Sequence, residues 1–143
     1  MRFPKIAVIA AAVLGSLALV AAPASAESSA EETLAAPDGN FYAYIGYGYV
    51  ALCGAWGGNS SDWGRCKNNT ASLFNNGLYG GADDVYVYWG TNQTGSRRGI
   101  CRGAAIADLH EYNFELDGKP GQGQELITNI ASHKWAAIAG CGA

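Results

Sequence analysis

The sequence contains few charged residues, and none of its segments is strongly basic. Charged side chains account for 15% of the 143 residues, and the formal net charge is -3. From Phe41 onward, eight acidic and seven basic side chains nearly cancel, so most of the negative charge precedes Phe41. Because a nucleic-acid-binding domain usually carries a basic patch or stripe, we expect no nucleic-acid partner.

The sequence also lacks the motifs of common hydrolases and zinc sites. It contains no H-E-x-x-H and no G-x-S-x-G. Its two histidines are His110 and His133, and the adjacent His110 and Glu111 would lie on opposite faces of a strand. The cysteines form no C-x-x-C pair, which disfavours a zinc site. We therefore expect a protein that is not an enzyme and that requires no cofactor.

Only one segment is long and uniformly apolar, and it lies at the N-terminus. The run from Ile6 to Ala22 follows Arg2 and Lys5 and precedes Ala24-Ser25-Ala26. A charged start, a short apolar run and a small-residue cleavage site are typical of a secretory signal peptide. We therefore predict a signal peptide over residues 1–26, a secreted mature protein, and no membrane segment after cleavage.

The composition changes twice in the mature chain. Residues 27–40 are acidic, small and almost without aromatic side chains, which predicts a flexible leader because so little apolar surface can be buried. Residues 41–143 are rich in glycine and aromatic residues. Their length, about 100 residues, is near that of one ordinary domain.

A short string occurs twice in this domain. Asn69-Thr70-Ala71-Ser72 is echoed by Asn129-Ile130-Ala131-Ser132, which suggests two similar units packed on each other. The four cysteines of an exported domain indicate two disulfides, for which three pairings exist. We favour Cys53–Cys66 with Cys101–Cys141, because each bridge then stays within one half of the repeat.

Short strand signals separated by turns run through the whole domain. The clearest strand is 85–89, which is β-branched and aromatic without a break. Further short strands are predicted at 41–52 (one or two), 72–74, 100–102, 112–114 and 134–138, with a turn at 75–77 and one or two helical turns within 104–110. This pattern is typical of an all-β sandwich or Greek-key arrangement.

Four tyrosines alternate with small residues near the start of the domain, at Tyr42, Tyr44, Tyr47 and Tyr49. On an exposed sheet face such rings can stack on sugars, whereas on a covered face they pack against the rest of the domain. The sequence leaves both interpretations open.

Two segments that contain these strands and turns, 67–77 and 85–95, resemble the βγ-crystallin-like secreted inhibitors of actinobacteria. This is the family of the Streptomyces metalloproteinase inhibitor. The family motif has an aromatic residue followed seven positions later by glycine, and Tyr88 and Gly95 fit this spacing. In the first half, Trp56 and Gly58 fit the end of the motif, with Ala51 where the opening aromatic belongs. The resemblance implies a double Greek-key sandwich and the inhibition of an extracellular metallopeptidase.

The same resemblance raises the question of calcium. Related folds often bind Ca²⁺ through Asn/Asp-Asn/Asp-x-x-Ser/Thr-Ser, which Asn68, Asn69 and Ser72 match in one copy and Asn129 and Ser132 in the other. Neither copy contains a carboxylate, so any affinity should be weak. Alternatively, these side chains cap turns by bonding the local backbone.

The sequence thus predicts a secreted peptidase inhibitor that acts through a loop pinned beside a disulfide. Candidate contact residues are Ile100 and Arg102, which flank Cys101, and the segment between Cys53 and Cys66. The alternative is a βγ-crystallin-like module that binds calcium or carbohydrate without inhibiting a peptidase.

Overall fold

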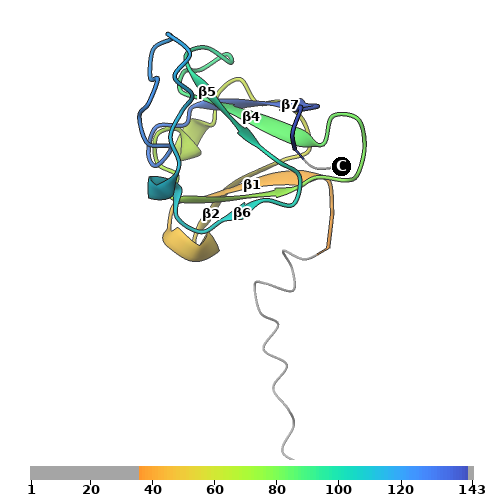
Figure 1. Cartoon of the computed structure of the whole chain (residues 1–143). Helices are drawn as coiled ribbons and strands as arrows, with labels where there is room; N and C mark the ends of the chain where they lie inside the picture. Colours follow the sequence, from red (N-terminus) through yellow and green to blue (C-terminus); the bar gives the residue numbers. More distant parts are fainter. Residues whose placement is uncertain (1–35, 142–143) are drawn as a thin grey trace, which may run out of the picture.

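The computed structural model describes residues 36–141, which form two β-sheets packed face to face (Figure 1). The predicted signal peptide and residues 27–35 of the predicted leader lie outside the described residues. Residues 36–40 lie against Asn76, since Asp38 and Gly39 both donate backbone hydrogen bonds to its carbonyl (3.2 and 3.0 Å). Among the described residues, no helix is long and apolar enough to cross a bilayer.

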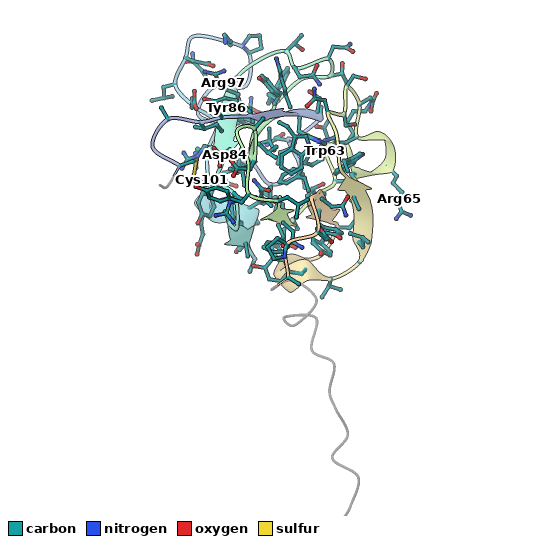
Figure 2. All side chains as sticks on the ribbon, turned by 90° about the vertical axis from the view of Figure 1, so that its right-hand side faces the viewer. Trp63, Arg65, Asp84, Tyr86, Arg97 and Cys101 are labelled. Carbon is teal, nitrogen blue, oxygen red and sulfur yellow. A yellow bond between two sulfur atoms is a disulfide. The ribbon has the colours of Figure 1, made fainter. Side chains whose placement is uncertain are left out.

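The first sheet is antiparallel and has the order β2-β1-β3-β6. Its strands are β1 Asn40–Tyr44, β2 Leu52–Trp56, β3 Ser72–Asn76 and β6 Ala105–Ile106. Residues of the 41–52 segment thus divide between two strands, joined by the short 3-10 helix η1 Tyr47–Tyr49. At the free edge of β2, Arg65 bonds the carbonyls of Leu52 and Cys53 and points away from the domain (Figure 2).

The second sheet is also antiparallel, with the order β5-β4-β7. Its strands are β4 Asp84–Tyr88, β5 Arg97–Ile100 and β7 Ser132–Ala136. Two further 3-10 helices lie in the connections, η2 Gly64–Cys66 and η3 Leu109–Glu111.

Each half of the chain contributes one segment to the sheet of the other half. Strand β6, from the second half, pairs with β3 of the first. In return Ser60, from the first half, forms an isolated antiparallel bridge with His133 on β7. The two sheets are therefore interlocked and form one domain, as expected of two Greek keys, and the predicted all-β sandwich is confirmed.

The core lies between the sheets because alternate residues of each strand face inward. Phe41, Leu73, Val85 and Val87 are fully buried there. The predicted disulfides are both present, with Cα–Cα distances of 5.5 Å for Cys53–Cys66 and 5.1 Å for Cys101–Cys141. Each bridge closes within one half of the molecule, as the repeat suggested.

The repeated Asn-x-Ala-Ser string marks the same corner in both halves. In the first half the Ser72 hydroxyl accepts from the Tyr49 amide (3.0 Å) and donates to the Gly46 carbonyl (2.7 Å). In the second half the Ser132 hydroxyl accepts from the Gln93 amide (3.0 Å) and donates to the Gly90 carbonyl (2.6 Å). The string is thus a marker of duplicated architecture.

This corner corrects the position of the first-half motif. The prediction for Tyr88 and Gly95 is confirmed, since Gly95 has a φ of 76°. The equivalent aromatic in the first half is Tyr44, whose ring contacts Tyr49 at 5.8 Å, and Ala51 occupies the glycine position with a φ of 59°. The placement of the motif at Trp56 and Gly58 was therefore wrong. The true position was hidden in the sequence because an alanine, Ala51, adopts the left-handed conformation usual for glycine, which costs an L-residue about 1–2 kcal/mol.

Several strand bounds also differ from the prediction. Residues 75–77 were expected to turn, but β3 continues through Asn76. Residues 112–114 form no strand beyond a single bridge between Asn113 and Glu125. Within 104–110, residues 105–106 form the short strand β6 because their backbone groups pair with β3, and the expected helical turn is limited to η3, which begins at Leu109.

Candidate functional site

The loop that joins β3 to β4, residues 77–83, exposes two adjacent apolar side chains. Tyr79 is 85% exposed and Leu78 is 60% exposed. This β3–β4 loop connects the two halves of the chain and projects beside the C-terminal end of the domain (Figure 1). A pair of apolar side chains this exposed has no role in the core, which makes the loop a candidate contact element.

Asn75 holds both ends of the β3–β4 loop. Its side chain is fully buried. The side-chain oxygen accepts from the Gly77 amide (3.0 Å), and the side-chain nitrogen donates to the carbonyls of Asp83 (3.0 Å) and Ile100 (3.1 Å). Because one buried amide bonds the first and last residues of the loop, the loop is anchored at its base.

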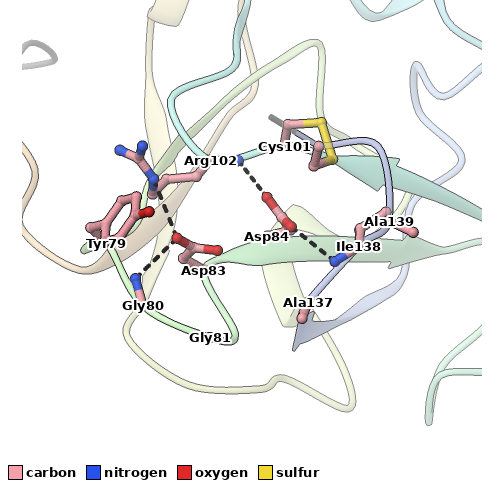
Figure 3. A pocket seen from close by; sticks show the side chains of 11 residues that line it. Tyr79, Gly80, Gly81, Asp83, Asp84, Cys101, Arg102, Ala137, Ile138 and Ala139 are labelled. Atoms are coloured by element: carbon pink, nitrogen blue, oxygen red, sulfur yellow. Dashed lines mark hydrogen bonds and ion pairs between the residues drawn. A yellow bond between two sulfur atoms is a disulfide. The ribbon is translucent and has the colours of Figure 1, made fainter. Parts of the chain in front are cut away.

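Asp83 and Arg102 order the exposed part of the loop. An Asp83 carboxylate oxygen accepts from the Gly80 amide (3.0 Å) and lies 3.3 Å from the Arg102 guanidinium. The same guanidinium lies over the Tyr79 ring, 5.1 Å from its centre. Figure 3 shows this chain of contacts from Gly80 through Asp83 and Arg102 to Tyr79.

A third buried group ties the neighbouring segments together. Asp84 is 4% exposed, and its carboxylate accepts from the backbone amides of Arg102 and Ile138, both at 2.9 Å. The Cys101–Cys141 disulfide links the same two segments (Figure 3). The loop therefore rests on a base that is covalently and electrostatically fixed.

Two hollows border the β3–β4 loop. One is a groove of about 800 Å³, bordered by Tyr79, Asp83, Arg102 and the C-terminal segment 137–141. The other, about 410 Å³, is bordered by Leu78, Ala82, Trp135 and glycines of two other segments. Because residues of the loop border both hollows, a partner that contacts the loop has room beside it.

The residues predicted as inhibitory contacts have different positions. Ile100 is 2% exposed, so its side chain belongs to the core and cannot touch a partner. The Arg102 side chain is 36% exposed and borders the groove. Between Cys53 and Cys66, the rings of Trp56 and Trp63 stack on each other with their centres 4.9 Å apart. No large apolar side chain of this segment is exposed.

The residues predicted to bind calcium come from two turns that lie together. Asn68 donates a backbone bond to the Ile130 carbonyl (2.9 Å), and Thr128 donates one to the Thr70 carbonyl (3.0 Å). Asn68 and Asn69 are exposed, and Asn129 is partly buried, with its side-chain nitrogen bonded to the Glu125 carbonyl.

These turns fit a calcium ion poorly. Ser72 and Ser132 are fully buried, and both hydroxyls already donate and accept a backbone hydrogen bond. The residues before them, Ala71 and Ala131, have no side-chain oxygen. Ca²⁺ requires several oxygen ligands, and only neutral oxygens remain in the two turns.

The described residues contain one other cluster of three potential metal ligands, Asp84, Cys101 and Cys141. Both sulfurs belong to the disulfide, and the Asp84 carboxylate accepts the two backbone bonds described above. This cluster is therefore a structural joint.

The four tyrosines do not form a flat exposed platform. Tyr44 is 8% exposed, and Tyr42 stacks between Tyr44 (6.4 Å) and Phe74 (6.5 Å). Tyr47 is exposed but lies on the connecting helix η1, where it stacks on His110 at 5.9 Å. Most of this aromatic surface is thus used within the domain.

His133 is buried in an aromatic cage. Its ring lies 5.2 Å from Phe41, 5.1 Å from Trp56 and 5.8 Å from Trp63. The Trp63 indole, seen inside the domain in Figure 2, donates to Nδ1 (2.8 Å), which leaves Nε2 to donate to the Gly58 carbonyl (2.8 Å). Burial lowers the pKa of His133 to about 4, so this ring is neutral at physiological pH.

Sequence reasoning missed Asn75 and the exposed pair Leu78 and Tyr79. Asn75 was assigned to a turn, although it lies two positions after Leu73 and therefore on the inward face of the same strand. A polar residue on a core face must find internal partners. That alternation was the signal available in the sequence.

The comparisons support the fold and extend no further. No protein-family model matches the chain, and no curated protein matches it in sequence. A solved structure from work on the evolution of the eye lens beta-gamma-crystallin domain fold is similar, with a TM-score of 0.52 and 14% identity. The likeness covers 70% of this chain and 87% of that one. The chain therefore has a βγ-crystallin-like fold of two antiparallel sheets with two disulfides, which are compatible with an extracellular protein.

Proposed function

We propose that this protein is a secreted inhibitor of an extracellular peptidase and that the β3–β4 loop is the element that contacts the enzyme. The observation that carries the proposal is the combination of exposure and anchoring in one loop. Leu78 and Tyr79 project from the loop, while the buried Asn75 amide holds its two ends.

Anchoring favours tight binding because a loop that is already ordered loses little conformational entropy when it binds. The Asp83–Arg102 pair and the Cys101–Cys141 disulfide supply further restraint close to the exposed residues. The same restraint opposes the local opening that a peptidase needs in order to cut a chain. A loop of this kind can occupy a substrate cleft without being degraded quickly.

The alternative of a calcium- or carbohydrate-binding module has less support. The two Asn-containing turns offer few free oxygen ligands, since both serine hydroxyls are bonded to the backbone. The stacked tyrosines leave little ring surface for a sugar, as Tyr44 is almost covered. Neither set of residues combines exposure with anchoring as the β3–β4 loop does.

The test is a titration of peptidase activity with the purified secreted protein. A thermolysin-type metallopeptidase, chymotrypsin and trypsin would each be held at a fixed concentration while the protein is added. The proposal expects a stoichiometric loss of activity for at least one enzyme, with the protein recovered largely intact.

Two results would contradict the proposal. One is full activity of every enzyme at a large excess of the protein. The other is steady cleavage of the domain as an ordinary substrate, followed by electrophoresis. Reduction of both disulfides serves as the control, because an inhibitor that depends on a fixed loop should lose potency when its base is loosened.

A further inference from the structure

We infer that the β3–β4 loop selects a peptidase whose substrate cleft accepts large apolar or aromatic side chains, with Leu78 and Tyr79 as the residues that fill it. This inference rests on the proposed function and specifies its partner. It follows from which side chains of the loop are available to an enzyme and which are already used by the domain.

The available side chains are apolar. Tyr79 and Leu78 are 85% and 60% exposed and adjacent in sequence. The neighbouring Gly80 and Gly81 have no side chains that would obstruct an approaching surface. Large aromatic side chains dominate binding energy at interfaces because they bury much area with few rotatable bonds.

Among residues 36–141, one basic side chain borders the same groove, and it is engaged within the domain. The Arg102 guanidinium is paired with Asp83 at 3.3 Å and lies over the Tyr79 ring. A peptidase that selects lysine or arginine needs a basic side chain that can enter an acidic pocket. Arg102 would have to leave both partners, so we assign it a positioning role that fixes the Tyr79 ring.

The surroundings of the loop leave room for the walls of a cleft. Tyr79 borders the groove of about 800 Å³ and Leu78 borders the hollow of about 410 Å³. Each of the two exposed side chains thus has open space beside it. Such an arrangement fits a concave substrate cleft better than a flat surface.

A second exposed leucine provides a matched control. Leu116 is 84% exposed and lies in the loop 115–123, on the far side of the molecule from the β3–β4 loop (Figure 1). That loop is also internally bonded, through the Gly118 amide and the Gln122 side chain (2.9 Å). Leu116→Ala removes more exposed apolar surface than Leu78→Ala without touching the proposed contact.

The experiment compares inhibition constants of the wild-type protein and of Tyr79→Ala, Leu78→Ala, Tyr79→Lys and Leu116→Ala. The enzymes are a thermolysin-type metallopeptidase and chymotrypsin, which select apolar residues, and trypsin, which selects basic ones. Thermal melting of each variant confirms folding, which all four should retain because the replaced side chains are exposed.

The inference expects inhibition of an apolar-selecting enzyme and a loss of about 30-fold or more with Tyr79→Ala or Leu78→Ala, the size of a hot-spot truncation. Leu116→Ala should change the constant less than about twofold. Tyr79→Lys should weaken this inhibition further and create some inhibition of trypsin.

Inhibition that persists in both Leu78→Ala and Tyr79→Ala, or that disappears in Leu116→Ala, would overturn the inference while leaving an inhibitor in place. Wild-type inhibition of trypsin alone would do the same. If the wild-type protein inhibits none of the enzymes, the proposed function and this inference both fail.

Discussion

Acidification should destabilise the domain through His133. The His133 ring is fully buried between the sheets. Burial lowers its pKa, and the hydrogen bond with the Gly58 carbonyl raises the pKa by a smaller amount. Protonation would place a charge among Phe41, Trp56 and Trp63. It would also put a proton on Nδ1, where the Trp63 indole already donates.

The size of the effect follows from the two pKa values. In the folded protein the pKa of His133 is about 4, against an ordinary value of 6.5. Between these values the unfolded chain binds more protons, so stability is complete above pH 6.5 and falls as the pH drops to about 4. At 1.36 kcal/mol per pKa unit, the loss is about 3 kcal/mol.

The assay is urea unfolding at a series of pH values between about 7 and 4. Carboxylates such as Asp62, whose pKa is lowered by its hydrogen bond with Lys67, lose their contribution as the pH falls toward and below their ordinary value of 3.8, so the slope above about pH 5 belongs to His133. His133→Asn should lower stability at neutral pH and flatten the pH dependence. The slope should persist in His110→Ala, because that variant keeps His133 in its cage.

An unfolding free energy that stays constant from about pH 7 to 4.5 would refute the reasoning, as would a slope that disappears in His110→Ala. If His133→Asn does not fold, an NMR titration of the His133 ring in the wild-type protein gives the same answer. A ring that titrates near its ordinary value of 6.5 would show that the cage does not exclude the charge.

Three further predictions concern the buried polar groups and the turns. Asn75→Ala should cost about 2–4 kcal/mol in urea unfolding and weaken peptidase inhibition, because it leaves the loop ends without their bonding partner. Ser72→Ala and Ser132→Ala should each cost about 1–3 kcal/mol, and the two costs should be similar because each hydroxyl bonds one amide and one carbonyl of an equivalent corner. Millimolar Ca²⁺ should leave the melting temperature unchanged, because the two turns contain no carboxylate and both serine hydroxyls are bonded to the backbone; a clear upward shift would show that neutral oxygens suffice.

Periodicity and turn chemistry carried much of the fold in the sequence. The alternation of aromatic and small residues identified β1, and the unbroken β-branched and aromatic run identified β4. The repeat placed each cysteine pair within one half. The first-half corner was misplaced because Ala51 holds a backbone conformation that usually marks glycine. The strand bounds near 105 and 113 depend on partners far away in the chain, which local sequence does not encode.

The candidate site was less accessible to sequence reasoning because it depends on exposure. Ile100 and Arg102 flank the same cysteine, yet one is buried in the core and the other borders a groove. Leu78 and Tyr79 are apolar residues that a sequence reading would place in a core. Their exposure follows from the return of the chain to Asp83, which the Asn75 side chain enforces.

The two halves of the molecule share a frame, and the candidate site lies where they differ. Alignment of Ser72 with Ser132 makes Asn75 equivalent to Trp135, since both lie three positions later on corresponding strands. In the second half the tryptophan fills space near the core, and the chain continues into a tail held by the Cys101–Cys141 disulfide. In the first half the smaller asparagine leaves its amide free to bond both ends of a loop. The duplicated serine corners thus stabilise both halves in the same way. The first half differs in having Asn75 where the second half has Trp135, and Asn75 is what fixes the exposed loop.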